Sequence, residues 1–172
     1  MEKLKNRWWL IVGALGLNVL CHILTIVLHI PTTSLKVGGS YLAVAASAVV
    51  LCFLPLRFHV VVQIFVVFAA SVGNCMNMYT HLTYYDLVIH FLSGVVLAAG
   101  GWELCKNRPF ALMFSWAGAG LWEIFEFSCD VLLRAGMQGA ATDTMTDMIA
   151  GFLGGLCWVI GRSLKKNVDF PR

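Results

Sequence analysis

The chain has 172 residues, of which 59% are hydrophobic and 12% are charged, and its mean hydropathy is +0.80. About 25% of the residues of an ordinary soluble domain are charged, so this composition excludes a soluble protein and predicts an all-α integral membrane protein. The net charge of +3 is small, and it gives no reason to expect nucleic acid as a partner.

Apolar runs separated by polar or helix-breaking residues predict a bundle of six transmembrane helices. Each run is about long enough to cross a hydrocarbon layer of roughly 30 Å at a rise of about 1.5 Å per residue. The segment "IPTTSLKVGGS" after the first run holds Pro and Gly and predicts a loop. We expect a single transmembrane domain over residues 1–172, with spans at 8–30, 41–56, 60–79, 85–104, 110–133 and 146–163.

Basic residues test this number of spans independently of hydropathy, because they accumulate in short cytoplasmic loops. With six spans, ten of the twelve Lys and Arg residues lie on one side, and only Lys36 and Arg134 lie on the other. This asymmetry favours six helices with both termini in the cytoplasm. The ten are Lys3, Lys5, Arg7, Arg57, Lys106, Arg108, Arg162, Lys165, Lys166 and Arg172.

Small residues recur in the last two predicted spans, as "AGAG" at 117–120 and "GFLGG" at 151–155. Glycines at such spacing let helix backbones approach closely in lipid. These faces predict close helix packing, and a homodimer is one arrangement that would use them.

Three predicted spans each carry a pair of polar residues near the outer face. The pairs are Asp86 with His90, Glu123 with Glu126, and Asp143 with Asp147. Residues three or four apart share one face of a helix, and the helical rise places all three pairs within roughly 15 Å of the outer surface. An ionised carboxylate inside a membrane costs at least about 2.5–3.5 kcal/mol, so we expect protons or a bound cation to offset this cost.

Carboxylates with one imidazole form a hard ligand set that suits Mg, Mn, Fe or Ca, with Zn accommodated through His90. The sequence therefore predicts a divalent metal site. The expected ligands are Asp86, His90, Glu123, Glu126, Asp143 and Asp147. In an enzyme, Glu123 would act as general base, and His90 would ligate the metal or carry a proton.

Two of the acidic residues also have purely structural interpretations. Asp143 stands at the start of the last span, where a carboxylate caps free backbone N–H groups. Asp130 stands four residues before Arg134 and is expected near water, where the two side chains can pair. Both alternatives stay open from the sequence.

Three segments resemble a known family. They are "YYDLVIHFLSG" at 84–94, "WEIFEF" at 122–127 and "DTMTDMIAGFLGG" at 143–155. In this order they resemble the YjdF-like proteins of the bacterial inner membrane, whose function is unassigned, and more distantly the VanZ-like proteins linked with teicoplanin resistance. Glu126 stands where the VanZ-like pattern tends to have Gln, which favours the YjdF-like family. The resemblance implies a multi-pass protein of the bacterial inner membrane but supplies no reaction.

Three functions fit these patterns. The first is a metal-dependent hydrolase or transferase that acts on a membrane lipid or lipid-linked phosphate at the outer leaflet. The second is a small proton- or cation-coupled transporter or binding protein that uses the same acids. The third is a non-catalytic membrane subunit.

Overall fold

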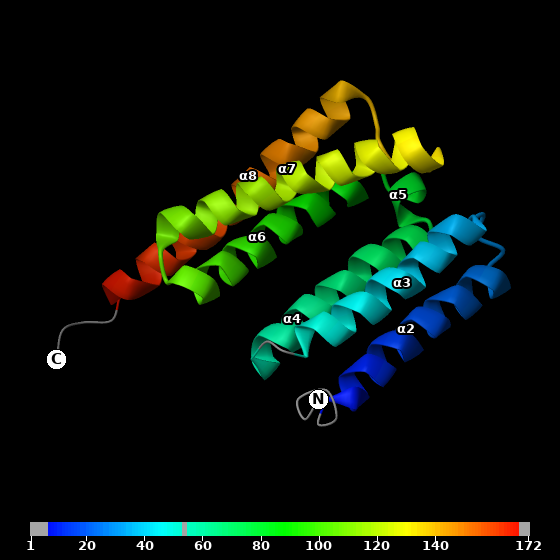
Figure 1. The fold of residues 1–172 in the computed structure, drawn as a ribbon, viewed down its shortest axis with the longest axis horizontal. Helices are drawn as coiled ribbons and strands as arrows, with labels where there is room; N and C mark the ends of the chain where they lie inside the picture. Colours follow the sequence, from blue (N-terminus) through cyan, green and yellow to red (C-terminus); the bar gives the residue numbers. More distant parts are fainter. Residues whose placement is uncertain (1–6, 53–54, 169–172) are drawn as a thin grey trace. The chain divides into compact units, whose positions relative to one another are not determined.

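A computed structural model describes residues 7–52 and 55–168, and all of the regular structure in these ranges is helical (Figure 1). The all-α fold predicted from composition is therefore confirmed. Lys3, Lys5 and Arg172, which contribute to the predicted orientation, lie outside the described residues, as do residues 53 and 54 of the predicted second span. The structure also does not describe the side chains of Arg57, Lys165 and Lys166.

The chain forms two compact units, Met1–Tyr85 and Asp86–Arg172. The first holds α2 (Trp8–Val27), α3 (Ser34–Leu51), α4 (Leu56–Val66), the π-helix η1 (Val67–Cys75) and α5 (Met78–His81). The second is built from α6 (Tyr85–Cys105), α7 (Arg108–Leu133) and α8 (Ala141–Val168), with the first residue of α6 counted in the first unit.

Four helical segments in the described ranges are long and apolar enough to cross a membrane: Trp8–Val27, Phe58–Cys75, Tyr85–Cys105 and Ala141–Leu164. They correspond to the first, third, fourth and sixth predicted spans. The remaining predicted spans, 41–56 and 110–133, correspond to α3 and α7, which are not among the four. A membrane protein with several apolar helices is thus established, and six crossings stay a prediction.

The second helix begins at Ser34 rather than at residue 41, inside the segment expected to be a loop. The Thr33 side chain explains this start, because its Oγ1 accepts a hydrogen bond of 3.2 Å from the backbone N–H of Lys36. A Thr that accepts from the third helical residue is a strong N-cap. The following helix also starts early, at Leu56 behind Pro55, and ends at Cys75 rather than at residue 79.

The first unit packs around small and branched side chains that are almost fully buried. Ala14 of α2, Val44 of α3, and Val67 and Ala70 of η1 form one apolar cluster. At its far end, the Thr25 hydroxyl of α2 donates to the Cys75 carbonyl at 3.1 Å. These contacts fix α2 beside η1 along the whole length of the π-helix.

A tight turn at Asn77 closes the first unit. Asn77 has φ +57°, the left-handed conformation that Asn tolerates better than most residues. Its side chain donates to the Pro31 carbonyl at 2.8 Å and accepts from Lys36 Nζ at 2.8 Å and Thr80 Oγ1 at 2.9 Å. The Asn77 side chain therefore finds all three of these partners within the first unit.

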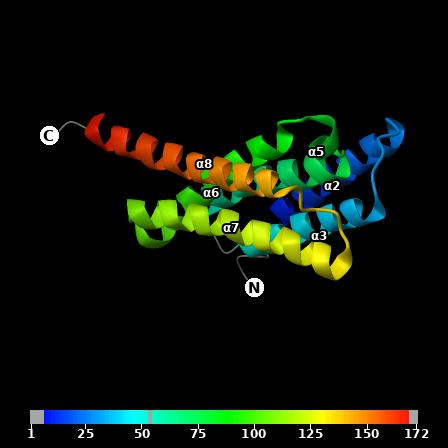
Figure 2. The ribbon, with the colours of Figure 1, turned by 90° about the horizontal axis from the view of Figure 1, so that it is seen from above.

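In the second unit α6, α7 and α8 run side by side in alternating directions (Figures 1 and 2). The hydroxyl of Ser115 on α7 contacts both neighbours, 3.0 Å from the Gly94 carbonyl of α6 and 3.2 Å from the Gly151 carbonyl of α8. A Cβ at Gly94 would overlap the Gly151 carbonyl, and a Cβ at Gly154 would overlap that of Phe91. The predicted close packing at these glycines is confirmed.

These glycine contacts lie inside the second unit, so the face that includes Gly151 and Gly154 is occupied by α6. The homodimer stays a prediction. At the opposite end of α6 and α8 from Asp86 and Asp147, the Arg162 guanidinium lies 4.2 Å from the ring centroid of Trp102. A cation over an indole ring fits the interface between membrane and water.

Candidate functional site

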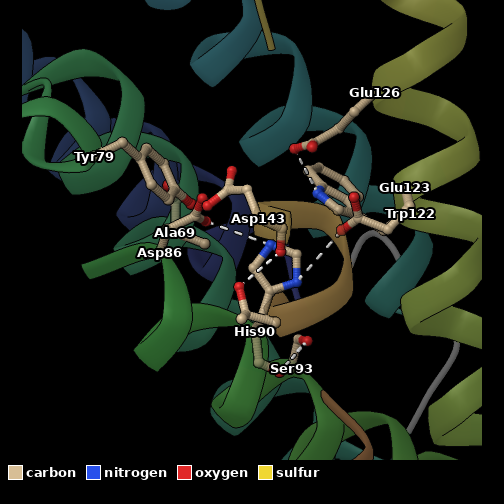
Figure 3. Close-up of polar contacts among 10 residues, drawn as sticks. Ala69, Tyr79, Asp86, His90, Ser93, Trp122, Glu123, Glu126 and Asp143 are labelled. Atoms are coloured by element: carbon tan, nitrogen blue, oxygen red, sulfur yellow. Dashed lines mark hydrogen bonds and ion pairs between the residues drawn. The ribbon is translucent and has the colours of Figure 1, made fainter. Parts of the chain in front are cut away.

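His90 lies at the centre of the candidate site, on the buried side of α6. Its Nε2 atom is 3.3 Å from Oδ1 of Asp86, one helical turn earlier (Figure 3). Because residues four apart on a helix face the same direction, the local sequence is enough to create this pair. His90 is buried, while the side chain of Asp86 is 41% exposed.

Asp147 reaches the same point from α8. One ligand atom from each of Asp86, His90 and Asp147 lies within 4.8 Å of the other two, and Asp147 is only 4% exposed. The close approach of α6 and α8 at their glycines makes this possible, because Gly151 lies one turn after Asp147 and Gly94 one turn after His90. Two helices thus supply an imidazole and two carboxylates to one small volume.

Glu123 adds a third carboxylate from α7. Its Oε1 lies 3.9 Å from Nδ1 of His90, on the opposite side of the imidazole from Asp86. Glu123 is 5% exposed, and neither of its oxygens has a hydrogen-bond partner of good geometry among the described residues, although Thr144 lies beside it. A buried carboxylate in this position needs a proton or a cation close by.

The other two predicted ligands lie outside this group. The Glu126 carboxylate accepts a hydrogen bond of 2.8 Å from the indole N–H of Trp122, one turn earlier on α7. Asp143 is exposed in the first turn of α8, with its carboxylate against the backbone of Gly139. This position favours the structural interpretation of Asp143, since an acid is stabilised at a helix N-terminus.

The buried residues of α7 explain why Glu123 points inward and Glu126 does not. They are Ala111, Ser115, Ala119 and Glu123, spaced four residues apart. This stripe of small side chains that ends in an acid is visible in the sequence. It would have predicted that Glu123 faces the interior and that Glu126 does not.

Asp130 has a structural role that the sequence analysis missed. Its two carboxylate oxygens accept hydrogen bonds from the backbone N–H groups of Met137, at 2.7 Å, and Gln138, at 3.0 Å. Arg134 instead ends α7 in the left-handed conformation, with φ +52°. Within the described part of the chain no ion pair joins Asp130 and Arg134, so Asp130 organises the α7–α8 loop.

An apolar groove of about 470 Å³ lies between α6 and α8. Its lining residues alternate along both helices with the residues of the candidate site. The sequence could not predict the groove, because apolar residues that face lipid and apolar residues that line a groove have the same pattern. The lining residues are Leu87, Val88, Phe91, Leu92, Thr146, Ile149, Ala150 and Leu153.

A family model described as "Predicted membrane protein (DUF2238)" matches residues 8–167, nearly the whole chain. No curated protein and no solved structure matches the chain.

Proposed function

We propose that this chain, which belongs to the DUF2238 family of predicted membrane proteins, is a divalent-metal-dependent membrane enzyme that acts on a lipid or lipid-linked phosphate. One observation carries the proposal. Asp86, His90 and Asp147 converge from two helices within 4.8 Å, and the buried carboxylate of Glu123 lies 3.9 Å from the same imidazole.

A metal would explain why these groups can share one small volume. Bonds of about 2.0–2.2 Å to nitrogen and oxygen place two ligands of one ion at most about 4.4 Å apart. The observed 4.8 Å limit therefore requires only a slight contraction of the group. A divalent cation would also offset the repulsion among Asp86, Asp147 and Glu123, because no Lys or Arg side chain among the described residues of the second unit forms an ion pair with them.

The groove between α6 and α8 supports a lipid substrate. Its lining is almost entirely apolar, and the lining residues Leu87, Phe91 and Thr146 are sequence neighbours of Asp86, His90 and Asp147. We infer that an acyl or prenyl chain in the groove would bring an attached phosphate to the metal. A metal held by carboxylates binds phosphate oxygens and activates water. Glu123, within reach of His90, would accept the proton of the attacking water.

The carboxylates near the two ring nitrogens of His90 favour a second candidate function, proton transport. Asp86 lies at Nε2 of His90 and Glu123 lies at Nδ1. A carboxylate at each ring nitrogen is the arrangement of a proton relay. A small proton-coupled transporter would use the same residues without a metal.

The proposal also includes the orientation of the chain in the membrane. Six helices cross a bacterial inner membrane, both termini lie in the cytoplasm, and the site faces the outer leaflet. The support is the distribution of basic residues, because Lys106, Arg108 and Arg162 belong to the end of the second unit away from His90. The YjdF-like, and more distantly VanZ-like, resemblance of residues 84–155 stays part of this proposal.

Metal binding is tested first. The purified protein is stripped with chelator and titrated with Mn²⁺ and Zn²⁺ by calorimetry, and we expect one site that is lost in Asp147→Asn. Glu126→Gln is the matched control, because Glu126 lies outside the ligand group and its amide can still accept from Trp122. Unchanged titrations after Asp147→Asn, or no binding to the wild type, would contradict the metal site.

The reaction is tested next with phosphate release from lipid phosphates in mixed micelles, with and without metal. Loss of activity in His90→Ala and Asp147→Asn, with activity retained in Glu126→Gln, supports the enzyme. Proton uptake into liposomes in metal-free buffer, abolished by Glu123→Gln, would instead support the relay.

A further inference from the structure

The first unit contains buried polar side chains that the proposed site does not use. Asn18 of α2, His59 and Gln63 of α4, and Ser71 of η1 are between 0% and 5% exposed. Seven of their side-chain nitrogen and oxygen atoms lack a hydrogen-bond partner in the described residues. Few native buried polar atoms are unpartnered, so a group of seven in one unit requires an explanation.

These side chains lie along one interior face. His59 and Gln63 are one turn apart on α4, and the next turn on this face brings Val67, which belongs to the same buried cluster as Ala14 of α2. Asn18 follows Ala14 by one turn, and Ser71 follows Val67 by four residues.

The contact between Thr25 and Cys75 closes the far end of this face. Asn18 lies between Ala14 and Thr25 on α2, and Ser71 lies between Val67 and Cys75 on η1. Both buried side chains therefore lie between two contacts that join α2 and η1, the apolar cluster and the Thr25–Cys75 bond. The four side chains thus fall into two groups, one with His59 and Gln63 and one with Asn18 and Ser71, and the buried Val67 stands between Gln63 and Ser71 along the chain.

The chemistry of both groups identifies the ligand. Two carboxamides, one imidazole and one hydroxyl offer donors and acceptors in nearly equal number and no permanent charge, which does not suit an ion. If the interior were dry, the combined desolvation cost of seven unpaired atoms would be comparable to the whole stability of an ordinary domain. Water, which both donates and accepts, satisfies such atoms in protein interiors.

We propose that the first unit binds two clusters of internal water, one at His59 and Gln63 and the other at Asn18 and Ser71, with Val67 as the apolar side chain between them. The clusters form a polar path along α4 and η1 within a membrane-embedded unit. All of the residues that form this path belong to the first unit.

Radiolytic footprinting of the full chain in lipid nanodiscs tests the proposal, because it oxidises side chains that contact bound water. We expect His59 to be oxidised despite its complete burial, with oxygen-18 incorporated from labelled water. An unlabelled His59 in the folded wild type would overturn the proposal.

Thermal unfolding of two polar-to-apolar variants gives a second readout. If the interior is dry, Gln63→Met and Asn18→Leu remove unpaired polar atoms and should stabilise the folded state. If the interior is hydrated, the same substitutions remove groups that are hydrogen-bonded to water, and no stabilisation follows. We expect the unfolding temperature to fall or to stay unchanged, and an increase in both variants would overturn the proposal. Ser40→Ala is the matched control, because Ser40 is equally buried but its hydroxyl donates to the Val37 carbonyl of its own helix.

Discussion

Replacing Gly154 with Ala tests whether the metal site depends on the close approach of α6 and α8. Gly154 lies on α8, two turns after Asp147, and faces the backbone of α6 next to His90. A Cβ at this position would overlap the carbonyl oxygen of Phe91 and lie 2.9 Å from its carbonyl carbon. Since both obstacles are backbone atoms, no side-chain rotation relieves the overlap.

The size of the effect follows from these distances. Carbon atoms in contact lie about 3.5–4.0 Å apart, whereas the new Cβ would lie 2.9 Å from the Phe91 carbonyl carbon on the wild-type backbone. The two helices must therefore separate by at least about 0.6 Å. Metal–ligand distances tolerate only about 0.2 Å. The variant therefore keeps all three ligands but holds them too far apart.

Thermal unfolding with and without metal measures the loss. Metal at about 100 times its dissociation constant stabilises the folded state by about 2.7 kcal/mol, and a hundredfold loss of affinity reduces this to about 0.4 kcal/mol. At about 2–4 °C per kcal/mol, the metal-induced shift in Tm should fall from about 5–11 °C to about 1–2 °C.

Gly161→Ala is the control, because it introduces the same change on the same helix where nothing lies within 4 Å of the new Cβ. It should keep the full metal-induced shift. If Gly154→Ala also keeps the full shift, the contact between α6 and α8 does not position the ligands and the reasoning is refuted.

Three further substitutions test the packing around the site and in the first unit. Ser115→Ala removes the hydroxyl that joins three helices and should lower the free energy of unfolding by about 1–3 kcal/mol, measured by denaturant titration in detergent. Ser163→Ala, whose hydroxyl contacts only its own helix, should change it by less than about 0.5 kcal/mol, and equal effects would contradict the special role of Ser115. Asp130→Ala should speed hydrogen exchange of the backbone amides in loop 134–140, whereas unchanged exchange would show that the carboxylate does not hold the loop. Asn77→Ala should lower Tm more than Asn77→Gly, because Gly adopts the φ of +57° without strain; the reverse order would mean that backbone conformation is not limiting.

Much of the helical structure could be predicted because it depends on local patterns. Hydropathy alone placed the apolar helices, and the four-residue separation of Asp86 and His90 was enough to put both on one face of α6. The start of α3 differs from the prediction because the N-cap at Thr33 lets the helix begin inside a segment that contains Pro and Gly.

The composition of the site could be predicted only in part. Asp143 and Asp147 occupy equivalent positions in the sequence pattern, yet Asp147 is buried beside His90 and Asp143 is exposed. Glu123 and Glu126 differ in the same way, because the stripe of small residues on α7 turns only Glu123 toward the interior.

The sequence by itself determined that this protein is a helical membrane protein and which residue types are available for a polar site. These properties depend on hydropathy and on spacing within single helices. Only the tertiary structure decided which of the acids meet, because that depends on how closely α6 and α8 approach. A missing Cβ at Gly94 and Gly154 lets their backbones come into contact, and this contact brings Asp147 from one helix to Asp86 and His90 of the other.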